Sequence, residues 1–310
     1  MDLRVNKVPS WRKNRYSASR LRTRRIPHRT RNMSFVRKMS RKQLVNWEPL
    51  KKIGIIGVPF EKGQKKYGVS VAPAAMRSAG LIDHLKEICT VDGHYKVNDN
   101  MILIWVDAHA DINTNKTSES GSVHGMPVAL LVKELSDYWP YLPTMDWQVP
   151  QFSIKNLGYV GLRSVDEYER LAIEKYGVPA FAMEDIEECG IQKCIHHILQ
   201  KLDPDGTKPI HVSFDIDSLD SLEAPSTGTA VRGGLTLREG IKLMEIIYAT
   251  GRLRAIDLVE INPALGNDSD RKRTIDAGLC ILKAALGFSR RGTMPRGVLD
   301  LPVQTHHETK

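Results

Sequence analysis

Short apolar runs alternate with longer amphipathic stretches along most of this 310-residue chain. The apolar runs predict strands at residues 53–58, 101–106, 156–162, 179–183, 210–214 and 255–261. The amphipathic stretches predict helices at residues 72–86, 127–135, 186–202, 236–251 and 274–288. Because the strands show no polar alternation, both faces of their sheet should be covered by helices. We therefore predict an α/β fold of three layers, with a parallel sheet between two layers of helices.

Two of the predicted strands end in acidic motifs. Asp107, His109 and Asp111 follow the second strand, and Asp215 and Asp217 follow the fifth. Alternate residues of an extended backbone point the same way, so each group can converge beyond the carboxyl ends of the strands, where open parallel sheets bind ligands. Unpaired buried carboxylates are costly, and oxygen-rich ligation with one imidazole favours Mn²⁺ or Mg²⁺ over zinc or copper. The sequence therefore predicts a divalent-metal site, the alternative being solvated turn acids after two ordinary strands.

The net charge of +9 is concentrated at the N-terminus. Residues 1–50 hold fifteen Lys and Arg residues against Asp2 and Glu48, a balance of +13, which leaves −4 for the rest of the chain. The high overall charge therefore does not indicate a nucleic-acid-binding domain, and nucleic acid is expected only at the basic tail. No apolar run approaches the ~18 residues of a membrane span. Four scattered cysteines without paired zinc spacing indicate reduced thiols and weakly favour an intracellular protein.

Composition divides the chain into three parts. We predict a basic, disordered N-terminal extension at 1–47, an α/β domain at 48–302 and a flexible C-terminal tail at 303–310. The extension is rich in Arg, contains Ser and is almost free of acids, which is typical of a mitochondrial transit peptide. A mitochondrial location is the prediction, with a cytoplasmic one as the alternative. A tail that binds RNA or acidic surfaces, or an upstream extension of little function, also fits this composition.

Six motifs, in one order along the chain, resemble the arginase (ureohydrolase) family. They are Gly54–Phe60, Asp107–Asn113, Ser120–Gly125, Ser213–Asp220, Thr227–Thr229 and Glu260–Pro263. The resemblance implies the arginase/deacetylase-like fold and the hydrolysis of L-arginine to L-ornithine and urea through a manganese-bridged hydroxide. It also implies two Mn²⁺ ions per chain and a homotrimer, in which Arg290 matches an arginine of the subunit contact.

The same resemblance implies roles for individual residues. The manganese ligands would be Asp107, His109, Asp111, Asp215 and Asp217. The catalytic residues would be Asp111 as proton acceptor, His124 as proton shuttle and Glu260 as the carboxylate that binds the guanidinium. Substrate would be bound by Asn113 and Ser120 at its α-carboxylate, by Asp166 and Glu169 near its α-amino group, and by Thr229 beside the pocket. The α-carboxylate contacts favour arginine over agmatine.

This sequence departs from the family pattern at two places. Ser164 stands where arginases commonly carry Asp, which would loosen recognition of the α-amino group. The family's Gly-Gly-Asp-His motif, whose His is a ligand of the first metal, occurs nowhere in the chain. Only fifty residues separate Gly57 from Asp107, so an internal strand–helix segment is expected to be missing; His84 or His94 would have to replace the lost ligand. The alternative function is a catalytically impaired arginase-like chain that acts only through assembly with other subunits.

Overall fold

The computed structural model describes residues 55–57, 59, 66–79, 81, 100–138, 150–288, 290, 292 and 300–303. The chain divides into two units, Met1–Trp47 and Glu48–Lys310, and every described residue belongs to the second. The predicted N-terminal extension and nearly all of the predicted C-terminal tail lie outside the described residues, as do His84 and His94.

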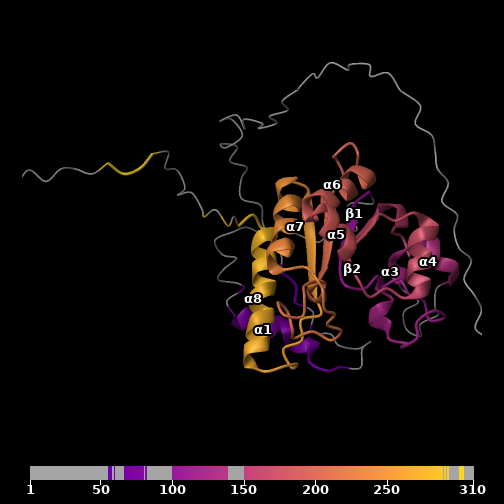
Figure 1. Cartoon of the computed structure of the whole chain (residues 1–310), viewed down its shortest axis with the longest axis horizontal. Helices are drawn as coiled ribbons and strands as arrows, with labels where there is room; N and C mark the ends of the chain where they lie inside the picture. Colours follow the sequence, from indigo (N-terminus) through magenta and orange to yellow (C-terminus); the bar gives the residue numbers. More distant parts are fainter. Residues whose placement is uncertain are drawn as a thin grey trace, which may run out of the picture. The chain divides into compact units, whose positions relative to one another are not determined.

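The centre of the second unit is a parallel sheet of five strands (Figure 1). The strands are β1 (Ile102–Val106), β2 (Leu157–Leu162), β3 (Ala180–Ala182), β4 (Ile210–Asp215) and β5 (Leu253–Val259). Their order across the sheet is β3-β2-β1-β4-β5, so the crossovers run outward in both directions from β1. The parallel sheet predicted from the sequence is confirmed.

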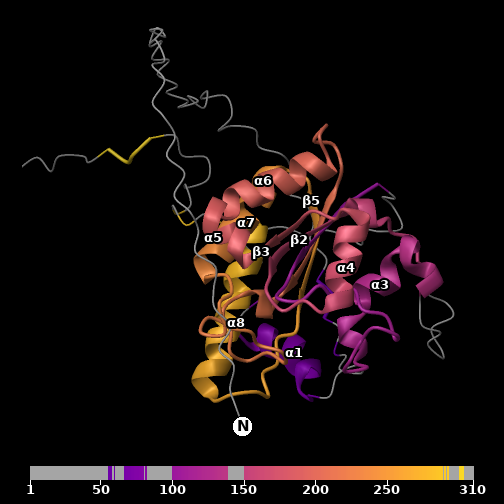
Figure 2. The same ribbon diagram turned by 45° about the vertical axis from the view of Figure 1, so that its right-hand side comes forward.

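Helices cover both faces of this sheet, as predicted (Figure 2). One layer contains α5 (Met183–Cys189), α6 (Ile191–Leu202), α7 (Leu237–Ala249) and α8 (Asp268–Ala285), with α1 (Ala72–Ser78) packed beside α8. The other layer contains α3 (Pro127–Leu131) and α4 (Glu167–Tyr176). Short 3-10 turns lie at Val69–Val71, Val123–Gly125, Lys133–Tyr138, Ile154–Asn156 and Ile216–Ser218.

The side chains of β1 divide between two apolar cores. Ile104 and Val106 belong to the core under α5–α8, whereas Leu103 and Trp105 belong to the core under α3 and α4. All five residues of β1 are buried, because the strand is covered by helices on both faces and by β2 and β4 on both edges. A central parallel strand therefore needs an apolar residue at every position, which is why no polar alternation was visible in the sequence.

The single helix predicted at 186–202 is wrong, because the structure has two helices separated by Gly190. Gly190 adopts a φ of 80°, a conformation that glycine reaches without steric cost, and it ends α5 before α6 begins. The last helix begins at Asp268, six residues before its predicted start. Its signal was present in the sequence, since Asn267 and Asp270 form a reciprocal capping box that uses Asn and Asp in place of Thr and Glu.

The first predicted strand is wrong for the residues that the structure describes. Ile55, Ile56 and Gly57 have no strand pairing, and Ile56 is 85% exposed. Among the described strands, β5 therefore lies at an open edge, where its residues are only half-buried and Val259 is 37% exposed. Backbone N–H and C=O groups on such an edge lack ladder partners within the described sheet.

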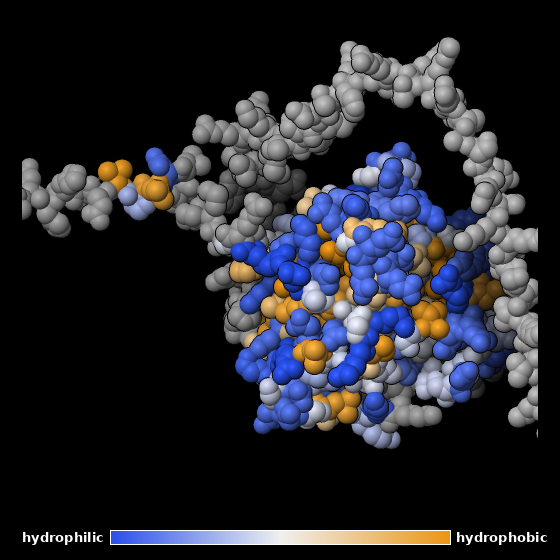
Figure 3. Space-filling model, in the orientation of Figure 1, coloured by the Kyte–Doolittle hydropathy of each residue, from blue (hydrophilic) through white to orange (hydrophobic). Residues whose placement is uncertain are grey.

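Hydrophilic residues cover most of the described surface in Figure 3, with hydrophobic residues interspersed. The exposed apolar side chains include Ile56, Tyr67, Leu222 and Leu301. Across the described residues, no helix is both long and apolar enough to cross a membrane.

The capping box of α7 gives a test of the fold. Thr236 accepts a hydrogen bond from the Glu239 amide, and the Glu239 carboxylate accepts one from the Thr236 amide. Thr236→Ala should lower the free energy of unfolding by about 1 kcal/mol, because an N-terminal amide of the helix loses its acceptor. Urea denaturation measures the change. Thr207→Ala, at an exposed turn position, is the control and should stay within about 0.5 kcal/mol of the parent; equal effects of the two substitutions would contradict the assignment.

Candidate metal centre

The carboxyl ends of β1 and β4 lie side by side and bring the two acidic motifs together. The two strands pair in parallel with Val106 opposite Phe214, so Asp107 and Asp215 follow at equivalent positions. A 3-10 turn at Ile216–Ser218 then carries Asp217 toward the first motif. The meeting of the two motifs was predicted, but the structure gathers only Asp107, His109 and Asp217 in one group, and it places Asp217 through the 3-10 turn rather than by the strand alternation that was predicted.

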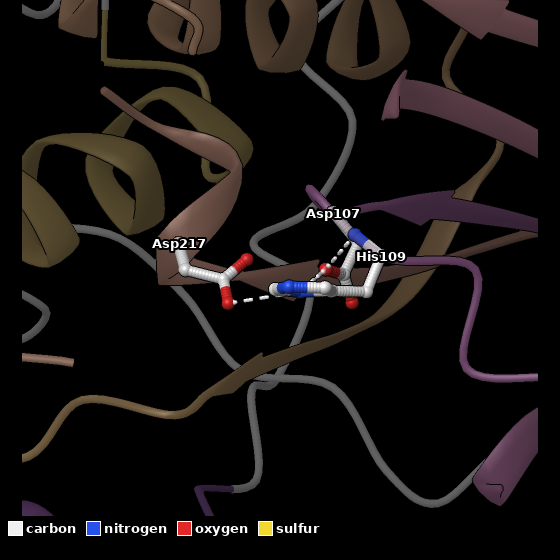
Figure 4. Close-up of side chains that lie close together, drawn as sticks. All are labelled: Asp107, His109 and Asp217. Carbon is white, nitrogen blue, oxygen red and sulfur yellow. Dashed lines mark hydrogen bonds and ion pairs between the residues drawn. The ribbon is translucent and has the colours of Figure 1, made fainter. Parts of the chain in front are cut away.

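Asp107, His109 and Asp217 form the core of the site (Figure 4). One potential ligand atom from each lies within 4.8 Å of the others. His109 Nδ1 is 3.2 Å from Asp217 Oδ2 and 3.4 Å from Asp107 Oδ1. Asp107 and Asp217 are buried, and His109 is 23% exposed. Two carboxylates and one imidazole at this spacing fit a hard divalent cation such as Mn²⁺.

The three side chains strongly perturb one another. Burial raises the pKa of Asp107 to about 7, and the charge of Asp217 adds to this effect against the opposing hydrogen bond with His109. Burial alone would lower the pKa of His109, but its bonds to the two carboxylates outweigh burial and raise that pKa to about 10. For Asp217 the contacts with His109 and Thr229 overcome burial and lower the pKa. The site therefore concentrates negative charge that a cation stabilises.

Asp215 and Asp111 lie close to this group but outside the set of three. Asp215 is buried, and its Oδ1 accepts a hydrogen bond of 2.8 Å from the Asp217 amide. Burial, followed by the charges of Asp217 and Asp107, raises its pKa well above the usual range. Burial and the charge of Asp107 likewise raise the pKa of Asp111. Asp111 has a φ of 52°, an uncommon conformation for a residue with a side chain, which is a strain typical of functional sites.

Three contacts that the sequence analysis missed hold the carboxylates in place. Trp105 Nε1 donates to Asp107 Oδ2 at 2.9 Å, and Thr229 Oγ1 donates to Asp217 Oδ2 at 2.9 Å. The Ala108 amide donates to Asp217 Oδ1 at 3.3 Å and so joins the two motifs directly. Only Trp105 left a signal in the sequence, since a residue two positions before Asp107 on a strand faces the same side. Thr229 was predicted to lie beside the substrate; its observed contact is with Asp217.

The loop after the first motif is tied to α4. Asn113 Nδ2 donates to Asp166 Oδ2 at 2.8 Å. Glu169 is 3% exposed, and its carboxylate accepts hydrogen bonds from the Ile112 amide at 3.1 Å and the Asp166 amide at 3.0 Å. The structure thus brings Asn113, Asp166 and Glu169 together and gives Glu169 a structural task in the capping box of α4. Their predicted contacts with substrate remain predictions.

The other predicted site residues lie around this loop and at the end of β5. Ser120 is exposed, and its Oγ accepts a hydrogen bond from the Ser122 amide at 3.1 Å. His124 is half-buried in the turn Val123–Gly125. Glu260 follows β5 with a φ of 60°, and its charge contributes to the raised pKa of Asp215, which places it at the same edge of the sheet. Their predicted roles also remain predictions.

A parallel α/β sheet with an acidic, metal-competent site beyond its strand ends defines the class of the protein, and comparison with known proteins identifies the family. A family profile described as "Arginase family" matches residues 83–287. The chain is 35% identical to arginase-2, mitochondrial, of Rattus norvegicus, covering 77% of this chain and 86% of the relative. It is 34% identical to arginase-1 of Sus scrofa, covering 77% and 94%. The crystal structure of arginase from Bacillus subtilis matches with a TM-score of 0.68 and 28% identity, covering 77% of this chain and all of that one. The chain belongs to the arginase family of hydrolases.

The alignment with the rat protein also gives the number of positions at which this chain has no residue. The match to the rat protein extends over 304 residues but takes in only 77% of the 310 residues here, about 239. About 65 aligned positions therefore have no residue of this chain opposite them. A βαβ unit needs about thirty residues, so this difference agrees with the predicted loss of an internal strand–helix segment.

Metal content follows from the ligands that converge. We expect at most one tightly bound Mn²⁺ per chain after dialysis, because three ligand atoms gather in one group and the Gly-Gly-Asp-His sequence is missing. Elemental analysis of purified, monodisperse protein measures the ratio. Two retained Mn²⁺ ions per chain would contradict this expectation and would require another ligand, with His84 and His94 as the first residues to substitute.

Metal binding should tighten as the pH rises. A divalent cation at this site would require an ionised Asp107 and a neutral His109, and the pKa values of these groups are raised to about 7 and about 10, respectively. Protons therefore compete with the metal, and the affinity should increase about tenfold or more between about pH 6 and pH 8. Calorimetry in two buffers of different ionisation enthalpy should show proton release. An affinity that is independent of pH would contradict the raised pKa values.

Proposed function

We propose that this chain hydrolyses L-arginine to L-ornithine and urea at the site formed by Asp107, His109 and Asp217. The observation that carries the proposal is the convergence of these three ligand groups at the carboxyl ends of β1 and β4 in a chain of the arginase family. When bound, Mn²⁺ would supply a Lewis acid that lowers the pKa of a water molecule and stabilises the clustered carboxylates. Asp107, His109, Asp215, Asp217 and Asp111 are the proposed ligands.

The residues of the chain would divide the remaining work. Asp111 belongs to the same motif as Asp107 and His109, and its carboxylate accepts the proton released as water attacks the guanidinium carbon. His124 then carries a proton to the leaving amine, since an imidazole has one nitrogen that can accept a proton and another that can donate one. Glu260 binds the guanidinium of the substrate, for which a carboxylate offers two matching acceptors. Asp107 and Asp217 stay ionised as ligands and do not exchange protons with the substrate.

Substrate recognition would come from the loop tied to α4. Asn113 and Ser120 bind the α-carboxylate of arginine, and Asp166 lies beside Asn113, where it can attract the α-amino group. Glu169 positions this loop through its bonds to the Ile112 and Asp166 amides. Thr229 holds Asp217 at the edge of the substrate pocket.

A second candidate function is supported by the missing segment. About 65 aligned positions without residues in this chain, together with the position of β5 at the edge of the described sheet, favour a catalytically impaired subunit that acts only by assembling with other subunits. Urea production by purified protein saturated with Mn²⁺ distinguishes the two candidates. Turnover supports the enzyme, whereas stable protein without turnover that enters trimers of an active arginase supports the impaired subunit.

We further propose a homotrimer and a mitochondrial location, with the cytoplasm as the alternative. Arg290 was predicted to serve a subunit contact; within this chain it forms a two-point ion pair with Glu245 at 3.0 Å and 2.9 Å. That pair fixes the guanidinium of Arg290 beside α7. The name of the rat relative, arginase-2, mitochondrial, agrees with the transit-peptide composition of residues 1–47.

Active protein should prefer arginine to agmatine. Asn113 and Ser120 would be left without an acceptor by agmatine, which has no α-carboxylate, so kcat/KM for arginine should be higher by at least about tenfold. Steady-state kinetics on both substrates give the ratio. Ser120→Ala should lower kcat/KM for arginine and spare agmatine. Equal turnover of the two substrates by the parent protein would overturn the assignment of this loop.

Substitution of Asp111 tests the proton acceptor. Asp111→Asn keeps the shape of the side chain but removes its charge and basicity, so urea production should fall at least about a hundredfold. Ser164→Asp, at an exposed position near the predicted α-amino site, is the comparison and should leave the rate equal or higher. Near-full activity of Asp111→Asn would refute this mechanism for the chain, and a null rate in the parent and both variants would favour the impaired subunit.

A further inference from the structure

Arg163 connects the two acidic motifs more extensively than any other described side chain near the site. It follows β2, and the five N–H groups of its guanidinium lie within hydrogen-bond distance of six backbone carbonyl oxygens, so that at least one N–H is shared between two of them. The acceptors are Gly161, Asp217, Ser218, Leu219, Val231 and Arg232, at 3.2, 2.7, 3.2, 3.2, 2.8 and 3.2 Å. The shortest of these bonds is to the carbonyl of Asp217 itself.

The backbone of Arg163 holds the other motif. Its amide donates to the Ala108 carbonyl at 2.9 Å, and the Ser164 amide donates to the same oxygen at 3.0 Å. Ala108 lies between Asp107 and His109, so one residue binds the segment that carries two of the three converging ligands. Its side chain binds the segment that carries the third.

The planar fork of Arg163, its guanidinium, packs closely against Gly234. A Cβ added to Gly234 would lie 2.5 Å from the guanidinium, so a larger residue there would displace the arginine. Burial lowers the pKa of Arg163, while the charges of Asp217, Asp220, Asp107 and Asp215 favour its charged form. The guanidinium thus places a fixed positive charge among the carboxylates while binding only carbonyl oxygens. Arg163 itself therefore donates no hydrogen bond to the carboxylate oxygens of the proposed ligands.

We propose that Arg163 is a positioning residue of the metal site, which sets the separation of Asp107 and His109 from Asp217 by binding both backbone segments at once. Its planar fork matters as well as its charge, because a lysine ammonium has three donors and cannot span six carbonyl groups. This proposal rests on the metal site proposed above. It predicts that the loss of the Arg163 side chain weakens metal binding although Arg163 is not itself a metal ligand, because the spacing of the ligands Asp107, His109 and Asp217 changes.

The test compares Arg163→Met with Arg252→Met as a matched control. Arg252 directly precedes β5 and so lies at the opposite end of the strands from the site. It is also half-buried, burial lowers its pKa, and it donates hydrogen bonds to Asp203 and to the Lys208 carbonyl. Arg163→Met should weaken Mn²⁺ binding, measured by electron paramagnetic resonance of free Mn²⁺, by about tenfold or more. Arg252→Met should leave the affinity within twofold even where it lowers thermal stability. Arg163→Lys should stay at least fivefold weaker than the parent.

A second measurement uses metal-free protein and separates this proposal from the metal site. Amide hydrogen exchange at Ala108 and Asp217, whose amides bond to Asp217 Oδ1 and Asp215 Oδ1, should accelerate at least tenfold in Arg163→Met and stay unchanged in Arg252→Met. A parent protein that binds no Mn²⁺ would defeat the proposed function, and the exchange rates would still decide the role of Arg163. Parent-like affinity and exchange in Arg163→Met, or equal losses in the control, overturn the proposal. If Arg163→Met does not fold, Arg163→Lys decides, and its full recovery of both properties overturns the role of the fork.

Discussion

The parallel pairing of β1 with β4 is the constraint on which the rest of this structure depends. It sets Val106 opposite Phe214, so that both acidic motifs leave the sheet at the same level. Full burial of β1 between two helical layers makes that level rigid, because a shift of one residue would exchange the contents of the two apolar cores. The helices of both layers pack against the sheet that contains this pair of strands, and the loop around Asn113 follows the motif at the end of β1.

The same pairing creates an electrostatic problem, because four aspartates lie beyond the ends of two buried strands. Positively charged side chains near the carboxylates reduce the repulsion between them. His109 contacts both Asp107 and Asp217, Arg163 binds the backbone carbonyl of Asp217, and the three side chains could hold a divalent cation. The raised pKa values of Asp107, Asp111 and Asp215 show that desolvation still dominates over these contacts. The desolvation free energy that the protein contacts do not offset is what makes the group suited to metal binding, because a bound cation would stabilise the ionised carboxylates.

The described sheet is less buried at its β5 edge than at its centre. The described sheet ends at β5, whose half-buried residues contrast with the full burial of β1 and β2. Glu260 stands at the end of this edge strand, whereas the three converging ligands come from β1 and from the turn after β4, the central and adjacent strands. Any loss of function should therefore concern the proposed guanidinium contact of Glu260 before it concerns the cluster of Asp107, His109 and Asp217.

The sequence by itself determined the α/β class, nearly every described strand and the meeting of the two acidic motifs, because buried parallel strands require continuous apolar runs and the carboxyl ends of parallel strands lie at one edge of the sheet. The tertiary structure decided which acids converge, since the turn at Ile216–Ser218 carries Asp217 to Asp107 and His109. The sequence did not determine the exposure of Ile56, since an apolar run looks the same whether or not a neighbouring strand exists to pair with it. It did not determine the break at Gly190 either, since a glycine within a helical pattern can be tolerated or can end the helix. It was also silent on Arg163, whose six acceptors are backbone carbonyls from three separate segments and leave no trace in residue type. Only the tertiary structure decided that contact, because it depends on how close the turn after β4 and the loop at Val231 come to the end of β2.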